Sequence, residues 1–131
     1  MTESFEKVKS YLLDLDCNIT YENTEEAVMV VEHESTGIKN LVIACADPIL
    51  IMEQFLFELK NISADILKNL LVKNRDIVHG AFALDENGSK VIFRDTLQLE
   101  NLDPNELEGS INSLSLLLSE YSDELIAYSK N

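Results

Sequence analysis

The chain has 131 residues, which is the length of one ordinary domain. Apolar residues make up 46% of it, enough to bury a core, and 24 acidic against 10 basic side chains give a formal net charge of -14. This balance argues against nucleic acid and against an anionic membrane surface as partners, because both are bound through lysine and arginine.

The N-terminal part of the chain predicts one helix and two strands. Residues 3–15 form the helix, because apolar side chains recur there every three or four positions. These side chains are Phe5, Val8, Leu12 and Leu15. Residues 18–22 follow as a short link, which could be extended. Residues 26–34 and 38–46 are predicted as strands, separated by a turn at residues 35–37.

The pattern of residues 50–59 fits a strand and a helix about equally well. Asp47 and Pro48 break the preceding strand, since proline has no N–H for a sheet ladder and restricts the residue before it. We predict a strand, because this turn is tight and because Ser63 offers the N-cap of a separate helix soon afterwards. That helix is expected to end near residues 73–74.

A hairpin is predicted next. Residues 77–84 and 90–97 are its strands, and Asp85-Glu86-Asn87-Gly88 is its turn. Asn-Gly between apolar runs is a strong hairpin signal, because both residues tolerate positive φ.

The last helix has the clearest start signal. Asp103 is placed as N-cap, Pro104 as the first helical residue and Glu106 as the third, as in a capping box. An apolar stripe then continues for several turns through Leu107, Ile111, Leu114, Leu118, Tyr121 and Leu125. The whole sequence therefore predicts one α+β domain over residues 1–131, in the order α-β-β-β-α-β-β-α, with a mainly antiparallel sheet and helices packed on one face.

A stretch in the second half of the chain is similar to a known family. It contains a helix ending in Asn74, the sequence Gly-Ala-Phe-Ala-Leu-Asp-Glu-Asn-Gly at residues 80–88, and a strand that carries Arg94. This succession resembles the YbjN-type domain, which in turn resembles class I type III secretion chaperones of the Tir chaperone-like fold. The resemblance implies a homodimeric, non-enzymatic domain with a chaperone-like or regulatory role, and it supplies no catalytic residue.

The predicted sheet carries more apolar surface than its helices can cover. Residues 27–31, 41–46 and 49–52 are apolar on both faces, whereas a sheet with one solvated face alternates apolar and polar residues. The second face must then meet residues 17–24, a second subunit or a segment of a client protein. We predict contacts with such a partner at Val28, Val30, Leu41, Ile43, Met52, Phe55 and Arg94.

The sequence leaves open which face is exposed. One candidate set is Val28, Val30, Leu41, Ile43, Ile51 and Phe55. The opposite set is Met29, Val31, Val42, Met52 and Leu56.

Charged residues near these strands have two interpretations. Arg94 either grips a carboxylate of a partner or forms a local ion pair with Asp95 or a cross-strand acid. Glu53 and Glu58 interrupt an apolar segment, and we expect them at a solvated strand edge.

The sequence gives little support for a metal, cofactor or phosphate-binding site. His33 and His79 lie on separate predicted strands and are too few for a metal site, and no cofactor is predicted. The four glycines are isolated, which disfavours a phosphate-binding loop. The alternative to protein binding is a small-ligand-binding domain or an enzyme with a pocket near Arg94 and His79.

The first residues, Met-Thr-Glu-Ser-Phe-Glu, lack the basic and apolar regions of a signal peptide. Residues 49–59, the densest apolar stretch, contain Glu53 and Glu58 and are shorter than the ~20 residues of a membrane-spanning helix. We therefore expect a cytoplasmic protein. Cys17 and Cys45 lie far apart without a CxxC pattern, so they are expected to be buried free thiols.

Overall fold

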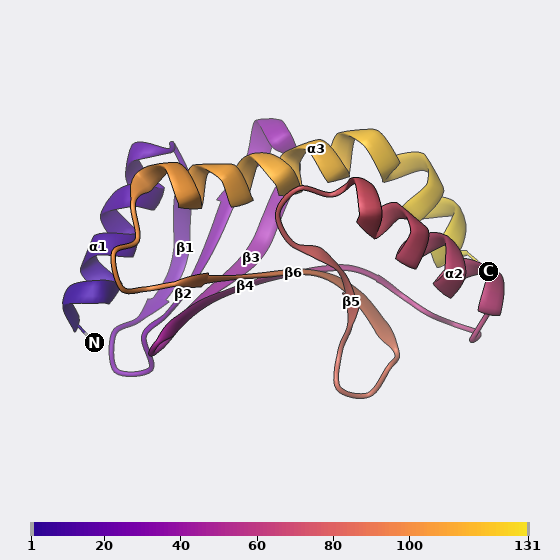
Figure 1. Ribbon diagram of the computed structural model, residues 1–131, viewed down its shortest axis with the longest axis horizontal. Coiled ribbons are helices and arrows are strands. Elements are labelled where there is room, and N and C mark those ends of the chain that lie inside the picture. The colour runs from indigo at the N-terminus through magenta and orange to yellow at the C-terminus, as the bar shows by residue number, and fades with distance from the viewer. Residues whose placement is uncertain (1, 131) are drawn as a thin grey trace.

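A computed structural model describes residues 2–130 as a six-stranded sheet with three helices (Figure 1). The elements are α1 (Thr2–Asp14), β1 (Asn18–Asn23), β2 (Val28–His33), β3 (Ile38–Ala46), β4 (Ile49–Glu58), α2 (Ala64–Lys73), β5 (Ala81–Leu84), β6 (Lys90–Gln98) and α3 (Pro104–Ser129). The strand order is β1-β2-β3-β4-β6-β5, and every neighbouring pair is antiparallel. All three helices lie on the same side of the sheet (Figure 1). The predicted α+β class with an antiparallel sheet is therefore confirmed.

Two predicted segments differ from the structure. The expected link at residues 18–22 is strand β1, so the order gains one strand and becomes α-β-β-β-β-α-β-β-α. Its side chains are mostly exposed, and it is held by main-chain pairing with β2 at the sheet edge, so it has no apolar pattern to reveal it. The predicted strand 77–84 starts only at Ala81, because a 3₁₀ turn occupies Asn74–Asp76 and Gly80 takes a φ of +80°. Residues 49–58 form a strand, as predicted.

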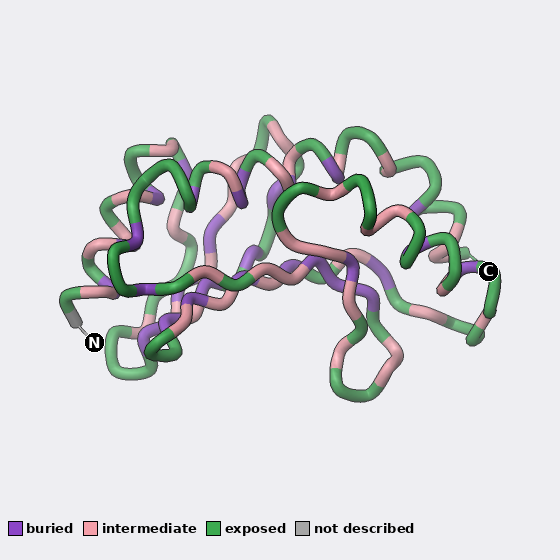
Figure 2. Tube along the Cα trace, in the orientation of Figure 1, coloured by how far each residue is buried: buried purple, intermediate pink, exposed green. Residues whose placement is uncertain are grey.

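The core lies between the helices and the face of the sheet below them. Figure 2 shows buried positions alternating with half-buried and exposed positions along several of the strands, as expected when helices cover one face of a sheet. The most deeply buried side chains include Met29, Leu41, Ile43, Leu50, Met52 and Phe93 from the sheet and Phe5, Val8, Leu12, Leu107 and Leu114 from the helices. Burial of each such side chain contributes roughly 1.5–3 kcal/mol before the entropy of ordering is subtracted.

Local signals fix the starts of two helices. The Ser63 hydroxyl accepts a hydrogen bond from the backbone N–H of Ile66 at 3.3 Å, at the start of α2. At α3, Asp103 Oδ1 accepts from the N–H of Glu106 at 3.0 Å, and Glu106 Oε1 accepts from the N–H of Asp103 at 3.3 Å. Both predicted caps are confirmed, and they satisfy N–H groups that the helix itself leaves unpaired.

Asn74 fastens the end of α2 to β5. Its Oδ1 accepts from the backbone N–H of Phe82 at 2.7 Å, and its Nδ2 donates to the carbonyl of Phe82 at 3.2 Å. β5 pairs with β6 and is the last strand of the sheet. The amide of Asn74 therefore pairs with this edge as a neighbouring strand would.

Replacing Asn74 by Ala should lower the free energy of unfolding by about 2 kcal/mol, because two hydrogen bonds disappear and the main-chain groups of Phe82 lose their partners. Asn69→Ala, at an exposed position of the same helix, should change it by less than about 0.5 kcal/mol. Urea unfolding followed by circular dichroism measures both. Similar losses in the two variants would contradict the role of Asn74.

Candidate functional site

The face of the sheet opposite the helices is apolar, and no helix among residues 2–130 lies over it (Figure 1). Cross-strand neighbours define two of its rows: Val30, Val42, Glu53, Arg94 and Ala81 in one, and Val28, Ala44, Ile51 and Thr96 in the next. Phe55 lies two residues beyond Glu53 on β4 and therefore on the same side. We call Val28, Val30, Val42, Ala44, Ile51, Glu53, Phe55, Ala81 and Arg94 the open face.

The open face is accessible although it is rich in aliphatic side chains. Phe55 is 54% exposed and Val42 is 39% exposed, while Val28, Val30 and Ile51 are half-buried by their neighbours. Contiguous exposed apolar surface is typical of protein interaction sites. β1 extends the sheet sideways, and its Tyr21 and Asn23 pair with Val30 and Val28, so β1 borders this surface and does not cover it.

The structure divides the residues predicted for partner contact between the two faces. Val28, Val30, Phe55 and Arg94 lie together on the open face. The other three lie on the face below the helices and are fully buried: Leu41, Ile43 and Met52. These three therefore form core rather than accessible surface in this structure.

Neither of the two candidate sets matches one face. Val42, and not Leu41, pairs with Val30, because the pairing of β2 and β3 is irregular between Val31 and His33 next to the 3₁₀ turn Glu34–Thr36. One residue of shift moves every side chain of a strand to the opposite face. The sequence alone gave no sign of this shift.

The open face has an ion pair at its centre. Arg94 of β6 and Glu53 of β4 are opposite in register, and their side chains form a salt bridge. Of the two interpretations of Arg94, the structure shows the local pair with a cross-strand acid. The expectation that Glu53 lies at a strand edge is wrong, because β4 runs between β3 and β6. The pair keeps both charges compensated among apolar neighbours, where an unpaired charge would be costly.

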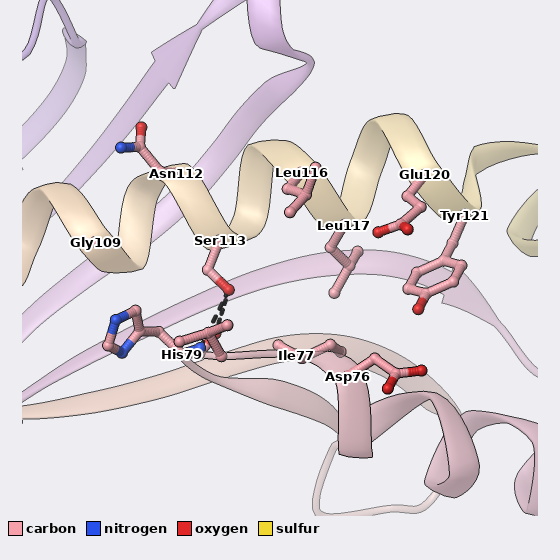
Figure 3. Close-up of a pocket in the computed structure, with 11 residues that line it drawn as sticks. Asp76, Ile77, His79, Gly109, Asn112, Ser113, Leu116, Leu117, Glu120 and Tyr121 are labelled. Carbon is pink, nitrogen blue, oxygen red and sulfur yellow. Dashed lines mark hydrogen bonds between the residues drawn. The ribbon is translucent and has the colours of Figure 1, made fainter.

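The predicted pocket near both His79 and Arg94 is not formed. His79 lines a pocket of about 210 Å³ between α3 and the segment that precedes β5 (Figure 3). Arg94 lines a shallow hollow with Gly80, Ala81 and Thr96. The two residues therefore line separate hollows.

The cysteines and His33, the other residues considered for chemistry, have structural roles. Cys17 and Cys45 are buried free thiols, as predicted, and burial raises the pKa of each. His33 Nδ1 lies 3.0 Å from Thr36 Oγ1 and closes the 3₁₀ turn. Within residues 2–130 no three His, Cys, Asp or Glu side chains gather as metal ligands would. None of the described helices has the length and apolarity to cross a bilayer.

Comparison with known proteins identifies the family. The model of the CesT_Tir_1 family matches residues 1–131. The chain belongs to the CesT_Tir_1 family. No curated protein matches its sequence. The resemblance to the YbjN-type and secretion-chaperone fold, predicted from residues 70–95, is thereby confirmed.

Solved structures share the fold of this CesT_Tir_1 protein. YbjN from E. coli, described as a putative transcription regulator, has a TM-score of 0.69 at 13% identity, with 92% of each chain covered. A chain of the Yersinia pestis type III secretion chaperone SycH in complex with a fragment of YscM2 has a TM-score of 0.61 at 17% identity, covering 96% of this chain and 99% of that one. A chain of the ExsC-ExsE complex has a TM-score of 0.63 at 15% identity, with 92% and 95% covered. At sequence identities this low, the comparison shows a similarity of fold alone.

Sequence reasoning missed Glu53 and Ala44 as members of the open face, and it placed Val42 in the set opposite to Val28 and Val30. One signal was present for Glu53: an acid inside an apolar strand, in a chain where arginine is rare and Arg94 lies on another apolar strand. A cross-strand pair of opposite charges stabilises two such strands in register.

Proposed function

We propose that this CesT_Tir_1 protein is a chaperone-like binding protein and not an enzyme. It holds an extended or amphipathic segment of a partner protein on the open face. The observation that carries the proposal is the accessible apolar surface around Phe55 and Val42, on a side of the sheet that no helix of residues 2–130 covers. Family membership supports it, as do fold relatives described as chaperones in complex with effectors, among them HopA1-SchA.

The chemistry of the open face favours such a segment. Each Å² of apolar surface removed from water contributes roughly 25 cal/mol, so side chains of a partner that cover Phe55 and Ile51 stabilise a complex. The Glu53–Arg94 pair supplies a donor and an acceptor to a partner's polar group. A segment with alternating apolar and polar residues satisfies both requirements.

Site-specific cross-linking tests where the partner lies. A photo-reactive phenylalanine derivative replaces Phe55 on the open face or, as a control, Leu13 on α1, which is similarly exposed at 52%. After irradiation in native lysate and capture of the tagged chain, we expect a cross-linked protein from position 55 and none of that identity from position 13. A partner cross-linked equally from both positions, or from neither, would refute binding on the open face.

We further propose that two copies associate through α2. Its Leu71 is 69% exposed beside a groove of about 210 Å³ that Leu67, Phe82 and Leu84 line. The segment from residue 60 to 75 also contains four of the ten basic side chains and a single acid. These are Lys60, Lys68, Lys73 and Arg75, with Asp65. Repulsion between two copies of charge -14 is lowest where this basic segment lies in the contact.

Leu71→Asp should convert the dimer into a monomer, because it places a charge in an apolar contact without a partner. Light scattering after gel filtration should give about half the mass of the unchanged protein. Leu13→Asp, which adds the same charge far from α2 in the sequence, should leave the mass unchanged. An unchanged chain that already has monomer mass would contradict the proposed association.

A further inference from the structure

A second exposed apolar site lies on the helix side of the molecule. We call the α3 groove the pocket between the segment before β5 and α3 that is lined by Ile77, Val78, His79, Ser113, Leu116 and Leu117 (Figure 3). Val78 is 81% exposed and Leu116 is 60% exposed, so two apolar side chains distant in sequence flank the same pocket in solvent. Neither side chain is part of the buried core. The open face lies on the other side of the sheet.

The α3 groove is held in shape by hydrogen bonds across it. The Ser113 hydroxyl donates to the carbonyl of His79 at 2.7 Å and accepts from the N–H of His79 at 3.3 Å (Figure 3). Gly109 lies beneath the His79 ring, where a Cβ would be 3.1 Å from Nε2. The segment therefore packs closely on α3, and a ligand would not have to order it, which favours binding.

One end of the α3 groove is acidic. Asp76 and Glu120 line it beside Tyr121 (Figure 3). Burial raises the pKa of the Tyr121 hydroxyl, and the charges of Glu120 and Asp76 raise it further. Glu124, one turn along, is paired with Lys73 at 2.6 Å, but neither Asp76 nor Glu120 has a salt bridge to any of residues 2–130. Lys73 Nζ lies 5.4 Å from the centroid of the Tyr121 ring, but its salt bridge is with Glu124. Apolar surface next to two carboxylates without a salt bridge is complementary to an apolar side chain that lies close to a lysine or arginine.

We propose that the α3 groove binds a cationic amphipathic segment of a partner protein, whose apolar side chain lies between Val78 and Leu116 and whose lysine or arginine meets Asp76 and Glu120. The occupant is a partner rather than a second copy, because this chain has only ten basic side chains and four of them lie in residues 60–75, which the proposed association through α2 covers. The site is independent of the open face, so either site can be lost while the other still binds.

The test uses a synthetic amphipathic helical peptide of leucine and lysine as the probe. Titrated into the ¹⁵N-labelled full chain, it should shift the amide signals of residues 76–79 and 113–121. Because the whole protein is acidic, a matched pair of variants separates the groove from general attraction. Asp76→Asn with Glu120→Gln removes two charges at the groove, and Glu25→Gln with Glu26→Gln removes two from the exposed segment between β1 and β2.

We expect the groove variant to weaken peptide binding by about tenfold or more and the control variant by less than about twofold, as screened attraction falls off within a Debye length. Leu116→Ser, at an exposed position, should also weaken binding, which attraction by charge alone does not predict. Equal effects of the two charge variants, shifts confined to the open face, or a groove variant that alters only self-association would each overturn the proposal. Cross-linking from position 55 should be unaffected by the groove variant, so this outcome is separate from that of the open face.

Discussion

Replacing Gly80 by Ala should lower the free energy of unfolding by about 3 kcal/mol or more, the largest loss expected from one added methyl group here. Gly80 has a φ of +80°, and a Cβ at this position would lie 2.6 Å from Cε1 and Cζ of Phe93. Phe93 is fully buried between the sheet and the helices, so its ring has no free space into which to move. Both the backbone strain and the steric overlap act on the start of β5.

Gly88→Ala is the matched control for this prediction. Gly88 has a φ of +71°, but a Cβ there would meet nothing within 4 Å. Its replacement should therefore cost only the strain of the left-handed conformation, about 1–2 kcal/mol. Urea unfolding followed by circular dichroism gives both values, and their difference measures the contact with Phe93. If the two variants lose the same stability, the close approach to Phe93 does not constrain residue 80.

The residues that resemble the YbjN-type domain turn out to position β5. Asn74 pairs with the main chain of Phe82, and Gly80 allows the chain to pass the ring of Phe93. Asp85 Oδ1 accepts from the N–H groups of Ser89 and Lys90 and so closes the hairpin turn. Of the residues named for the resemblance, Ala81 and Arg94 lie on the open face. Much of the pattern that carries the resemblance therefore has a packing role.

The parts of the fold that local chemistry determines could be predicted from the sequence. Ser63 and Asp103 cap helices through side chains that reach only three residues ahead, and such signals are visible in the sequence. The turn at Asp47-Pro48 and the cap at Ser63 favour a strand over a helix for residues 50–59, and the structure has strand β4 there. These predictions needed no knowledge of distant contacts.

The composition of the open face depends on long-range pairing, so the sequence predicted only part of it. β2 and β3 have a register irregularity near His33, and β4 and β6 have another between Phe55 and Phe57. Each irregularity changes which residues of a strand face the helices: Leu41 is buried in the core, and Phe57 is buried although Phe55, two residues earlier, is exposed. β1 was not predicted as a strand for a related reason. It is held by pairing with β2 and not by burial of its own side chains.

Phe55→Asp should reduce the affinity for the partner by at least about thirtyfold, because loss of a central aromatic contact commonly costs 2 kcal/mol or more and 1.4 kcal/mol is tenfold in affinity. The new carboxylate also lies beside Glu53, so it adds repulsion within the open face where a partner's apolar side chain would lie. Phe55 is half-exposed, and its removal should change the stability of the free protein little. Titration of the partner identified by cross-linking, with thermal unfolding of each variant in parallel, measures the two effects separately.

Leu13→Asp is the control, since it adds the same charge to an exposed leucine on α1, away from the sheet's open face. We expect it to bind the partner within about twofold of the unchanged protein, because a surface charge outside the contact mainly affects the association rate. The two variants have the same net charge, the same introduced side chain and a replaced residue of similar exposure. They differ only in which surface they alter, so the comparison is decisive. If Leu13→Asp weakens binding as much as Phe55→Asp, the partner responds to the overall acidity of the chain. If neither variant weakens binding, the apolar rows around Glu53 and Arg94 do not hold the partner.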